Sequence, residues 1–129
     1  MAEMRAMEFT DGLKLRLARR AVPEPQDDEI LIQISAAGVT PTEKLWYTTT
    51  HRPDGTPRAN AIPGHEFSGV VSALGGHTTE YRVGDSVFGF NDWFVEGATA
   101  EFCITEPSKL SSKPATLSHA EAAAARLAC

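Results

Sequence analysis

The sequence predicts a small, mainly β domain of the antiparallel barrel or sandwich type. Short runs of alternating apolar residues recur at intervals of roughly 8–15 residues, about seven in all. Turn-forming Gly, Pro, Asp and Asn residues separate these runs, and two segments carry helix-start signals. Because a chain of 129 residues has the size of one ordinary domain, we expect one β-rich unit with two short helices.

The first three strands are expected before residue 38. Arg5–Phe9 and Leu13–Ala18 alternate apolar and polar residues, and Thr10-Asp11-Gly12 separates them. Asp-Gly between two such runs is a strong hairpin signal. After a proline-broken connector, Glu29–Ala37 alternates isoleucines with other residues, which predicts a strand with one buried face.

A short helix and a long loop are expected next. Thr40 suits the N-cap position, Pro41 the first helical position and Glu43 the matching position of a capping box. The following stretch, Thr48–Ala61, is rich in turn formers and has no periodicity, which predicts an exposed, mobile loop. Loops of this length are uncommon unless they cover or form a site.

The stretch Ile62–Leu74 organises the rest of the chain. A proline-glycine turn precedes His65 and Glu66, and a Val/Ala-rich strand follows them. At the point where a loop becomes a strand, the backbone is held while side chains can face a cleft. Further on, strands are expected at Ser86–Phe90, at Ala98–Ile104 and around Leu110. A helix is expected to begin with a capping box formed by Ser118 and Glu121.

Composition excludes several classes of function. The chain is 42% apolar and 22% charged, as in soluble globular proteins. A net charge of −5 without a basic stripe argues against a nucleic-acid partner. No apolar run approaches the roughly 20 residues of a membrane span, and the N-terminus lacks a secretory pattern. Two cysteines, Cys103 and Cys129, make no disulfide framework, so we expect a cytoplasmic protein.

Four motifs in order resemble one known family. They are GVTPTE at Gly38–Glu43, PGHEFSGVV at Pro63–Val71, RVGDSVFG at Arg82–Gly89 and the tail from Leu117 to Cys129. Together they resemble the GroES-like catalytic domain of medium-chain dehydrogenases/reductases. The resemblance implies a GroES-like, partly open β-barrel with short helices over residues 1–117. It also implies that residues 118–129 begin a helix leading toward an absent Rossmann cofactor domain.

The resemblance favours the zinc-independent, quinone-oxidoreductase-like branch of the family. Zinc-dependent members carry a cysteine ligand at the position of Thr40, and a threonine hydroxyl is a poor zinc ligand. The four cysteines of the structural-zinc lobe would lie around Asn91–Gly97 and are absent. The implied activity is therefore NADP(H)-dependent reduction of quinones, enones or carbonyls by hydride transfer, with no zinc. The cofactor would be bound mainly by the absent domain, so we expect the isolated chain to be inactive.

The resemblance and the residue types together nominate the site residues. Thr40, Thr42, His65 and Glu66 are the candidate catalytic residues, and the hydroxyls of Thr40 and Thr42 are also expected to orient the nicotinamide ribose of the cofactor or the substrate carbonyl. Each also has a purely structural interpretation, as a cap or a turn-closing pair, and Glu43 is either a capping-box acceptor or an acidic partner of the site. Four aromatic residues are the expected walls of a pocket for flat substrates: Trp46, Tyr47, Trp93 and Phe94.

Two other functions stay open at this level. A zinc-dependent alcohol dehydrogenase domain would need His65 and Cys129 as ligands and would lose its zinc on His65→Ala. A non-catalytic GroES-like binding or oligomerisation module would use Thr48–Ala61 as an interaction loop. The expected partner is a small-molecule substrate. A homo-oligomer is left open, because apolar surface uncovered near Ala122–Cys129 would favour self-association.

Overall fold

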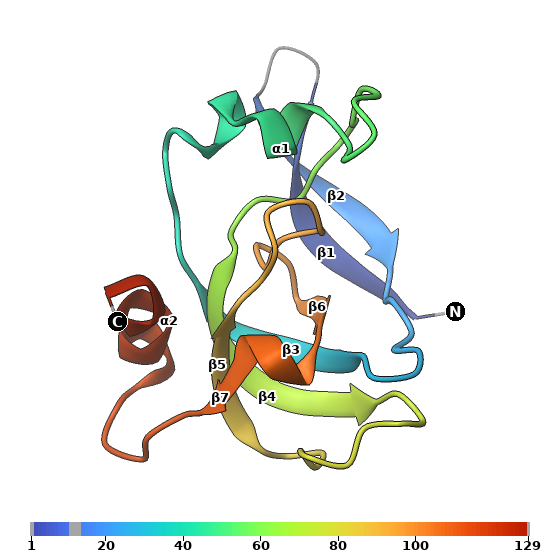
Figure 1. Ribbon diagram of the computed structural model, residues 1–129. Coiled ribbons are helices and arrows are strands. Elements are labelled where there is room, and N and C mark those ends of the chain that lie inside the picture. Colours follow the sequence, from blue (N-terminus) through green and yellow to red (C-terminus); the bar gives the residue numbers. More distant parts are fainter. Residues whose placement is uncertain (1, 11–13, 129) are drawn as a thin grey trace.

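The computed structural model describes residues 2–10 and 14–128, which form two antiparallel sheets and a few short helices (Figure 1). The smaller sheet pairs β1 (Glu3–Phe9) with β2 (Leu15–Ala21). This confirms the hairpin, although β2 lies further along the chain than expected. The predicted turn at Asp11-Gly12 lies outside the described residues.

The larger sheet has five strands in the order β6-β3-β4-β5-β7, all antiparallel. They are β3 (Ile30–Ala37), β4 (Glu66–Leu74), β5 (Ser86–Phe90), β6 (Phe102–Thr105) and β7 (Leu110–Ser112). Strand β4 lies at the centre, so the stretch that stood out in the sequence is the middle of the sheet. No strand pairing among the described residues closes the sheets into a complete barrel.

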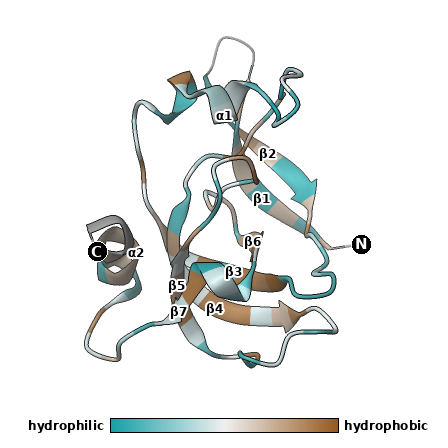
Figure 2. Cartoon of the chain, viewed as in Figure 1, coloured by the Kyte–Doolittle hydropathy of each residue, from teal (hydrophilic) through white to brown (hydrophobic). Residues whose placement is uncertain are grey.

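The alternating isoleucines of β3 form the core. Ile30 and Ile32 are fully buried and pack in one cluster with Phe67 and Val71 of β4 and Val87 of β5. Figure 2 shows the apolar colouring concentrated on β3 and β4. Each side chain of this size buried away from water stabilises the fold by about 1.5–3 kcal/mol, which is why these positions fix the sheet.

The segment before β6 joins the two sheets. The expected strand Ala98–Ile104 is shorter in the structure, where β6 begins at Phe102. The preceding residues bond to β1 instead: Met7 N–H donates to the Thr99 carbonyl at 2.9 Å, and Glu101 N–H donates to the Arg5 carbonyl at 3.0 Å. One chain segment therefore pairs first with the small sheet and then with the large one.

The C-terminal helix α2 (His119–Ala128) packs on the large sheet, mainly against β4 (Figure 1). Its predicted capping box is confirmed: Ser118 N–H donates to the Glu121 carboxylate at 2.9 Å, and Glu121 N–H donates to Ser118 Oγ at 3.1 Å. Ala122 and Ala123 are buried. The expectation of uncovered apolar surface is therefore wrong at these two residues, because the sheet covers them.

The expected helix start at Thr40 is wrong. A 3-10 turn, η1 (Glu43–Leu45), has Thr42 as its N-cap without a side-chain cap bond, and a short α1 (Tyr47–Thr50) follows. The capping box does not form because the Glu43 carboxylate accepts a hydrogen bond from Gly64 N–H instead. A second 3-10 turn, η2 (Pro107–Lys109), precedes β7.

The long loop is more ordered than expected. Its start lies in α1, His51 and Pro57 form an isolated β-bridge, and the Arg58 side chain is only 8% exposed. Residues 52–57 are exposed, as expected. Among the described residues, none of the helices combines the length and the apolar composition that crossing a bilayer requires.

Candidate functional site

The site is built around a glycine turn that leads into β4. Gly64 has a φ of +86°, and a Cβ at this position would lie 2.6 Å from Thr99 Oγ1. Glycine alone tolerates both the left-handed backbone and the close approach. The next residue is held too, since Asn91 N–H donates to the His65 carbonyl at 2.7 Å. The backbone that carries the His65 side chain is therefore held in place.

His65 and Glu43 form a buried pair. Nε2 of His65 lies 3.2 Å from Oε2 of Glu43, and their side chains are 3% and 5% exposed. Gly64 N–H donates to both carboxylate oxygens, at 3.2 and 3.1 Å. Nδ1 of His65 is buried and has no hydrogen-bond partner among the described residues. A buried polar atom without a partner needs an explanation, and a ligand that bonds to Nδ1 would supply one.

Glu66 lies beside this pair. Its carboxylate is buried and packs so closely on Gly38 that a Cβ there would lie 2.6 Å from Cδ. Thr40 Oγ1 donates to Glu66 Oε1 at 3.4 Å. Burial raises the pKa of Glu66 above its usual value, the Thr40 hydrogen bond opposes this, and the neighbouring Glu43 charge adds to it. A carboxyl group with a raised pKa is suited to give or take a proton.

Three aromatic rings, called here the aromatic wall, lie next to His65. They belong to Trp46, Phe90 and Trp93. The ring centroid of Trp93 lies 4.8 Å from that of Trp46, 4.6 Å from that of Phe90 and 5.0 Å from that of His65, all edge to face. Edge-to-face geometry is favoured by the ring quadrupoles, so the wall is a packed unit.

The structure does not bring every predicted site residue together. Tyr47 stacks on His51 with centroids 4.2 Å apart and is 56% exposed, and among the described residues it makes no ring contact with the wall. Phe94 follows Trp93 in its loop, where its N–H donates to Asp92, and no ring contact of the described residues joins it to the wall. Thr42 is exposed and its side chain caps nothing.

A cavity of about 380 Å³ adjoins the site on the side of the β1–β2 hairpin. Thr40, Glu43 and Gly64 line it, together with apolar residues such as Phe9 and Val39. Cavities of this size are typical of small-molecule sites. No group of three or more His, Cys, Asp or Glu side chains within residues 2–10 and 14–128 is arranged to hold a metal ion. Cys129, the second ligand of the zinc alternative, lies outside the described residues.

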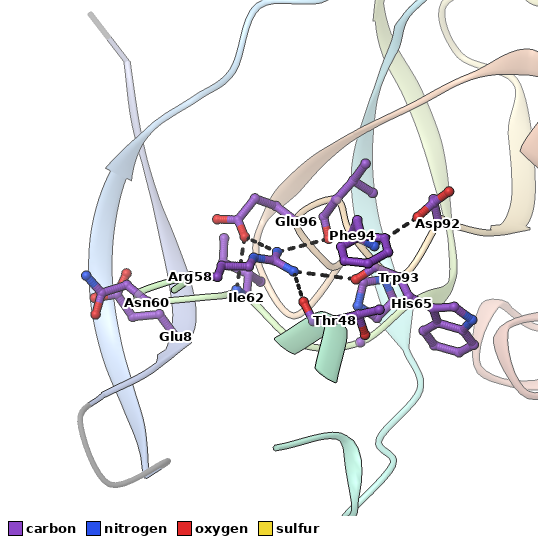
Figure 3. A network of polar contacts seen from close by, with 12 residues as sticks. Glu8, Thr48, Arg58, Asn60, Ile62, His65, Asp92, Trp93, Phe94 and Glu96 are labelled. Atoms are coloured by element: carbon purple, nitrogen blue, oxygen red, sulfur yellow. Dashed lines mark hydrogen bonds and ion pairs between the residues drawn. The ribbon is translucent and has the colours of Figure 1, made fainter. Parts of the chain in front are cut away.

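Sequence reasoning did not nominate two charged residues near the site. Arg58 and Glu96 join the long loop to the loop that carries Trp93 (Figure 3). Phe90 was also absent from the expected wall, because its alternating strand position indicates a core residue. Nothing in the local pattern around Arg58 distinguishes it from an exposed loop arginine.

The chain is similar to known proteins over most of its length. Residues 26–125 match the alcohol dehydrogenase GroES-like domain family. The chain is 38% identical over 125 residues to the synaptic vesicle membrane protein VAT-1 homolog-like of Mus musculus, covering 95% of this chain and 29% of that protein. It is 32% identical to the 2-methylene-furan-3-one reductase of Solanum lycopersicum (98% and 35%) and 30% identical to the quinone oxidoreductase of Rattus norvegicus (96% and 37%). The chain thus spans about a third of the length of these relatives.

Solved structures of similar proteins share the fold of this chain. The quinone oxidoreductase from Coxiella burnetii superposes with a TM-score of 0.84 at 25% identity, over 98% of this chain and 42% of that one. A cobalt- and zinc-bound thermostable alcohol dehydrogenase from Pyrobaculum aerophilum superposes with a TM-score of 0.75 at 25% identity, over 95% and 44%. The shared fold therefore occurs both in quinone oxidoreductases and in a zinc-bound alcohol dehydrogenase.

Proposed function

Because this chain belongs to the alcohol dehydrogenase GroES-like domain family of the medium-chain dehydrogenases/reductases, we propose that it is the catalytic-domain portion of an NADP(H)-dependent oxidoreductase. Its substrates are quinones, enones or carbonyl compounds. The similar proteins named quinone oxidoreductase and 2-methylene-furan-3-one reductase support this class. Residues 1–117 form the catalytic domain, and residues 118–129 begin the connection to a cofactor domain.

The buried imidazole of His65 is the observation that carries the proposal. Glu43 engages Nε2 as the nitrogen that carries the hydrogen, so Nδ1 is an acceptor that is left to bond to the hydroxyl formed on the reduced substrate oxygen. Thr40 and Glu66 form a hydroxyl–carboxyl pair that delivers a proton as charge develops on that oxygen. The aromatic wall packs against flat, conjugated substrates.

The exposed turn that contains Val39 and Thr42 is suited to contact the nicotinamide cofactor. Val39 is 84% exposed and Thr42 offers an outward hydroxyl, the apolar and polar groups that a ribosyl-nicotinamide contacts. When bound, the nicotinamide supplies the hydride. Thr40 and Thr42 would orient its ribose or the substrate carbonyl.

We propose that no catalytic zinc takes part. The donor set supports this: Thr40 stands where a thiolate is needed, and His65 Nε2 is engaged by Glu43. Elemental analysis of the full-length protein tests the point. Stoichiometric zinc that is lost in His65→Ala would establish the zinc-dependent alternative instead.

Turnover by the full-length protein tests the proposed function. We expect oxidation of NADPH with a quinone or an enone, and a loss of about 10²-fold or more in kcat/KM for His65→Ala. The isolated chain of residues 1–129 should show neither turnover nor micromolar NADPH binding in a fluorescence titration. An unaffected His65→Ala enzyme would contradict the assigned site. A full-length protein that binds no nicotinamide cofactor would favour the non-catalytic module.

A further inference from the structure

Arg58 is a buried cation with no part in the chemistry above. Its side chain is 8% exposed. The guanidinium donates to the carbonyls of Thr48 at 2.7 Å, Val95 at 3.1 Å and Trp93 at 3.4 Å, and to Oε1 of Glu96 at 2.6 Å (Figure 3). Burying a charge is costly unless it is paired and hydrogen-bonded. The arrangement of these acceptors therefore indicates what the charge holds in place.

The acceptors of Arg58 come from the two segments that carry the tryptophans of the aromatic wall. Thr48 lies two residues after Trp46, and the other carbonyls belong to Trp93 and its loop. A guanidinium has five donors in a rigid plane, so it can bond to both segments at once. The tryptophan rings meet 4.8 Å apart, and Trp93 contacts His65.

The acidic partner of Arg58 is itself anchored. Glu96 Oε1 also accepts a hydrogen bond from Ile62 N–H at 3.3 Å, and its Oε2 pairs with Arg20. Arg20 in turn pairs with Glu8 of β1 at 2.9 Å. The network ties both tryptophan segments to the β1–β2 hairpin, so the wall is attached to a sheet as well as to loops.

We propose that Arg58 is a positioning residue that holds Trp46 against Trp93 and Trp93 against His65, and so sets the shape of substrate that the site accepts. The substrate part of this inference rests on the proposed function. Arg58 touches no reacting atom, so its loss should impair binding of large flat substrates and leave the chemistry of small ones intact. A bicyclic quinone needs the ordered wall, whereas a short enone does not.

The first test measures the environment of the Trp93 ring and does not depend on enzyme activity. The full-length protein is labelled with 5-fluorotryptophan, and the Trp93 signal in the ¹⁹F spectrum is assigned with Trp93→Phe. Arg58→Met should shift or broaden that signal. Arg58→Lys should change it less, because lysine keeps a positive charge beside Glu96 but lacks the planar set of donors of a guanidinium. The matched control is Arg16→Met. Arg16 is 53% exposed, and its guanidinium hydrogen-bonds to Glu8 and, within the described residues, to neither tryptophan segment.

The second test separates binding from chemistry. For Arg58→Met we expect KM for 1,4-naphthoquinone to rise about tenfold, while kcat for methyl vinyl ketone stays within about twofold. If Arg58→Met is insoluble, Arg58→Lys carries the test with a smaller rise. An unchanged Trp93 signal in both variants, or equal KM changes for both substrates, would overturn the proposal. Wild-type protein without turnover would count against the proposed function alone, because the ¹⁹F result decides the position of Trp93 independently.

Discussion

The Glu43 carboxylate holds His65 from across the fold: its Oε2 lies 3.2 Å from Nε2 of the imidazole, and the pair is buried. The two residues come from different elements, the η1 turn and the start of β4. Because the same carboxylate also accepts the Gly64 N–H, it fixes both the ring and the turn that leads to it.

Replacing Glu43 separates its structural and chemical roles. Glu43→Ala leaves a buried N–H of Gly64 and the His65 ring without their acceptor, which should cost about 1–3 kcal/mol of unfolding free energy. Glu43→Gln keeps an acceptor oxygen and should cost less. Denaturant unfolding of both variants measures this. A smaller loss in the alanine variant than in the glutamine variant would show that the carboxylate is not the acceptor that matters.

Glu66 should make stability depend on pH. Its raised pKa means that the folded state keeps a proton at pH values where the unfolded carboxyl, with its ordinary value of 4.5, has lost it. The contribution of this group to stability therefore falls as pH rises above 4.5 through the folded pKa. In Glu66→Gln this fall is absent, so the Tm of the variant relative to wild type should increase from pH 4 to pH 8. Glu80→Gln, at an exposed position, serves as the control. If the Tm of Glu66→Gln relative to wild type decreased from pH 4 to pH 8, the raised pKa of Glu66 would be contradicted.

Gly64 should tolerate no side chain. Gly64→Ala places a Cβ 2.6 Å from Thr99 Oγ1 on a backbone with φ of +86°. The left-handed conformation alone costs about 1–2 kcal/mol, and the close contact adds to it. Gly76→Ala is the matched control, because nothing lies within 4 Å of its Cβ position. Thermal unfolding should show a clear loss of Tm for the first variant and little change for the second.

Trp93 should matter for substrate size. Trp93→Leu removes the edge-to-face contacts with His65, Trp46 and Phe90, each worth about 0.5–1.5 kcal/mol. We expect KM for a flat quinone to rise roughly 3- to 10-fold in the full-length enzyme. Tyr47→Leu is the comparison, because Tyr47 is exposed and stacks on His51 instead. Equal effects of the two substitutions would mean that the wall is not where the substrate binds.

Local patterns were sufficient for most of the fold. Alternating isoleucines place β3 with Ile30 and Ile32 inward, because a strand turns successive side chains to opposite faces. The Ser118–Glu121 capping box forms because its two partners lie within one helical turn. Strand limits were less accurate: β6 begins at Phe102, since Thr99 and Glu101 bond to β1, a partner far away in the sequence.

Local patterns were enough to predict that the strands and the helix cap exist, and that His65 and Glu66 stand at the head of the central strand, because these features depend on neighbours a few residues apart. Long-range packing is what brings Glu43 to His65 instead of to a cap on its own helix, stacks Tyr47 on His51, and buries the Arg58 side chain. Long side chains reach partners distant in sequence. The donors for a buried carboxylate and the acceptors for a buried guanidinium come together only once separate segments have packed.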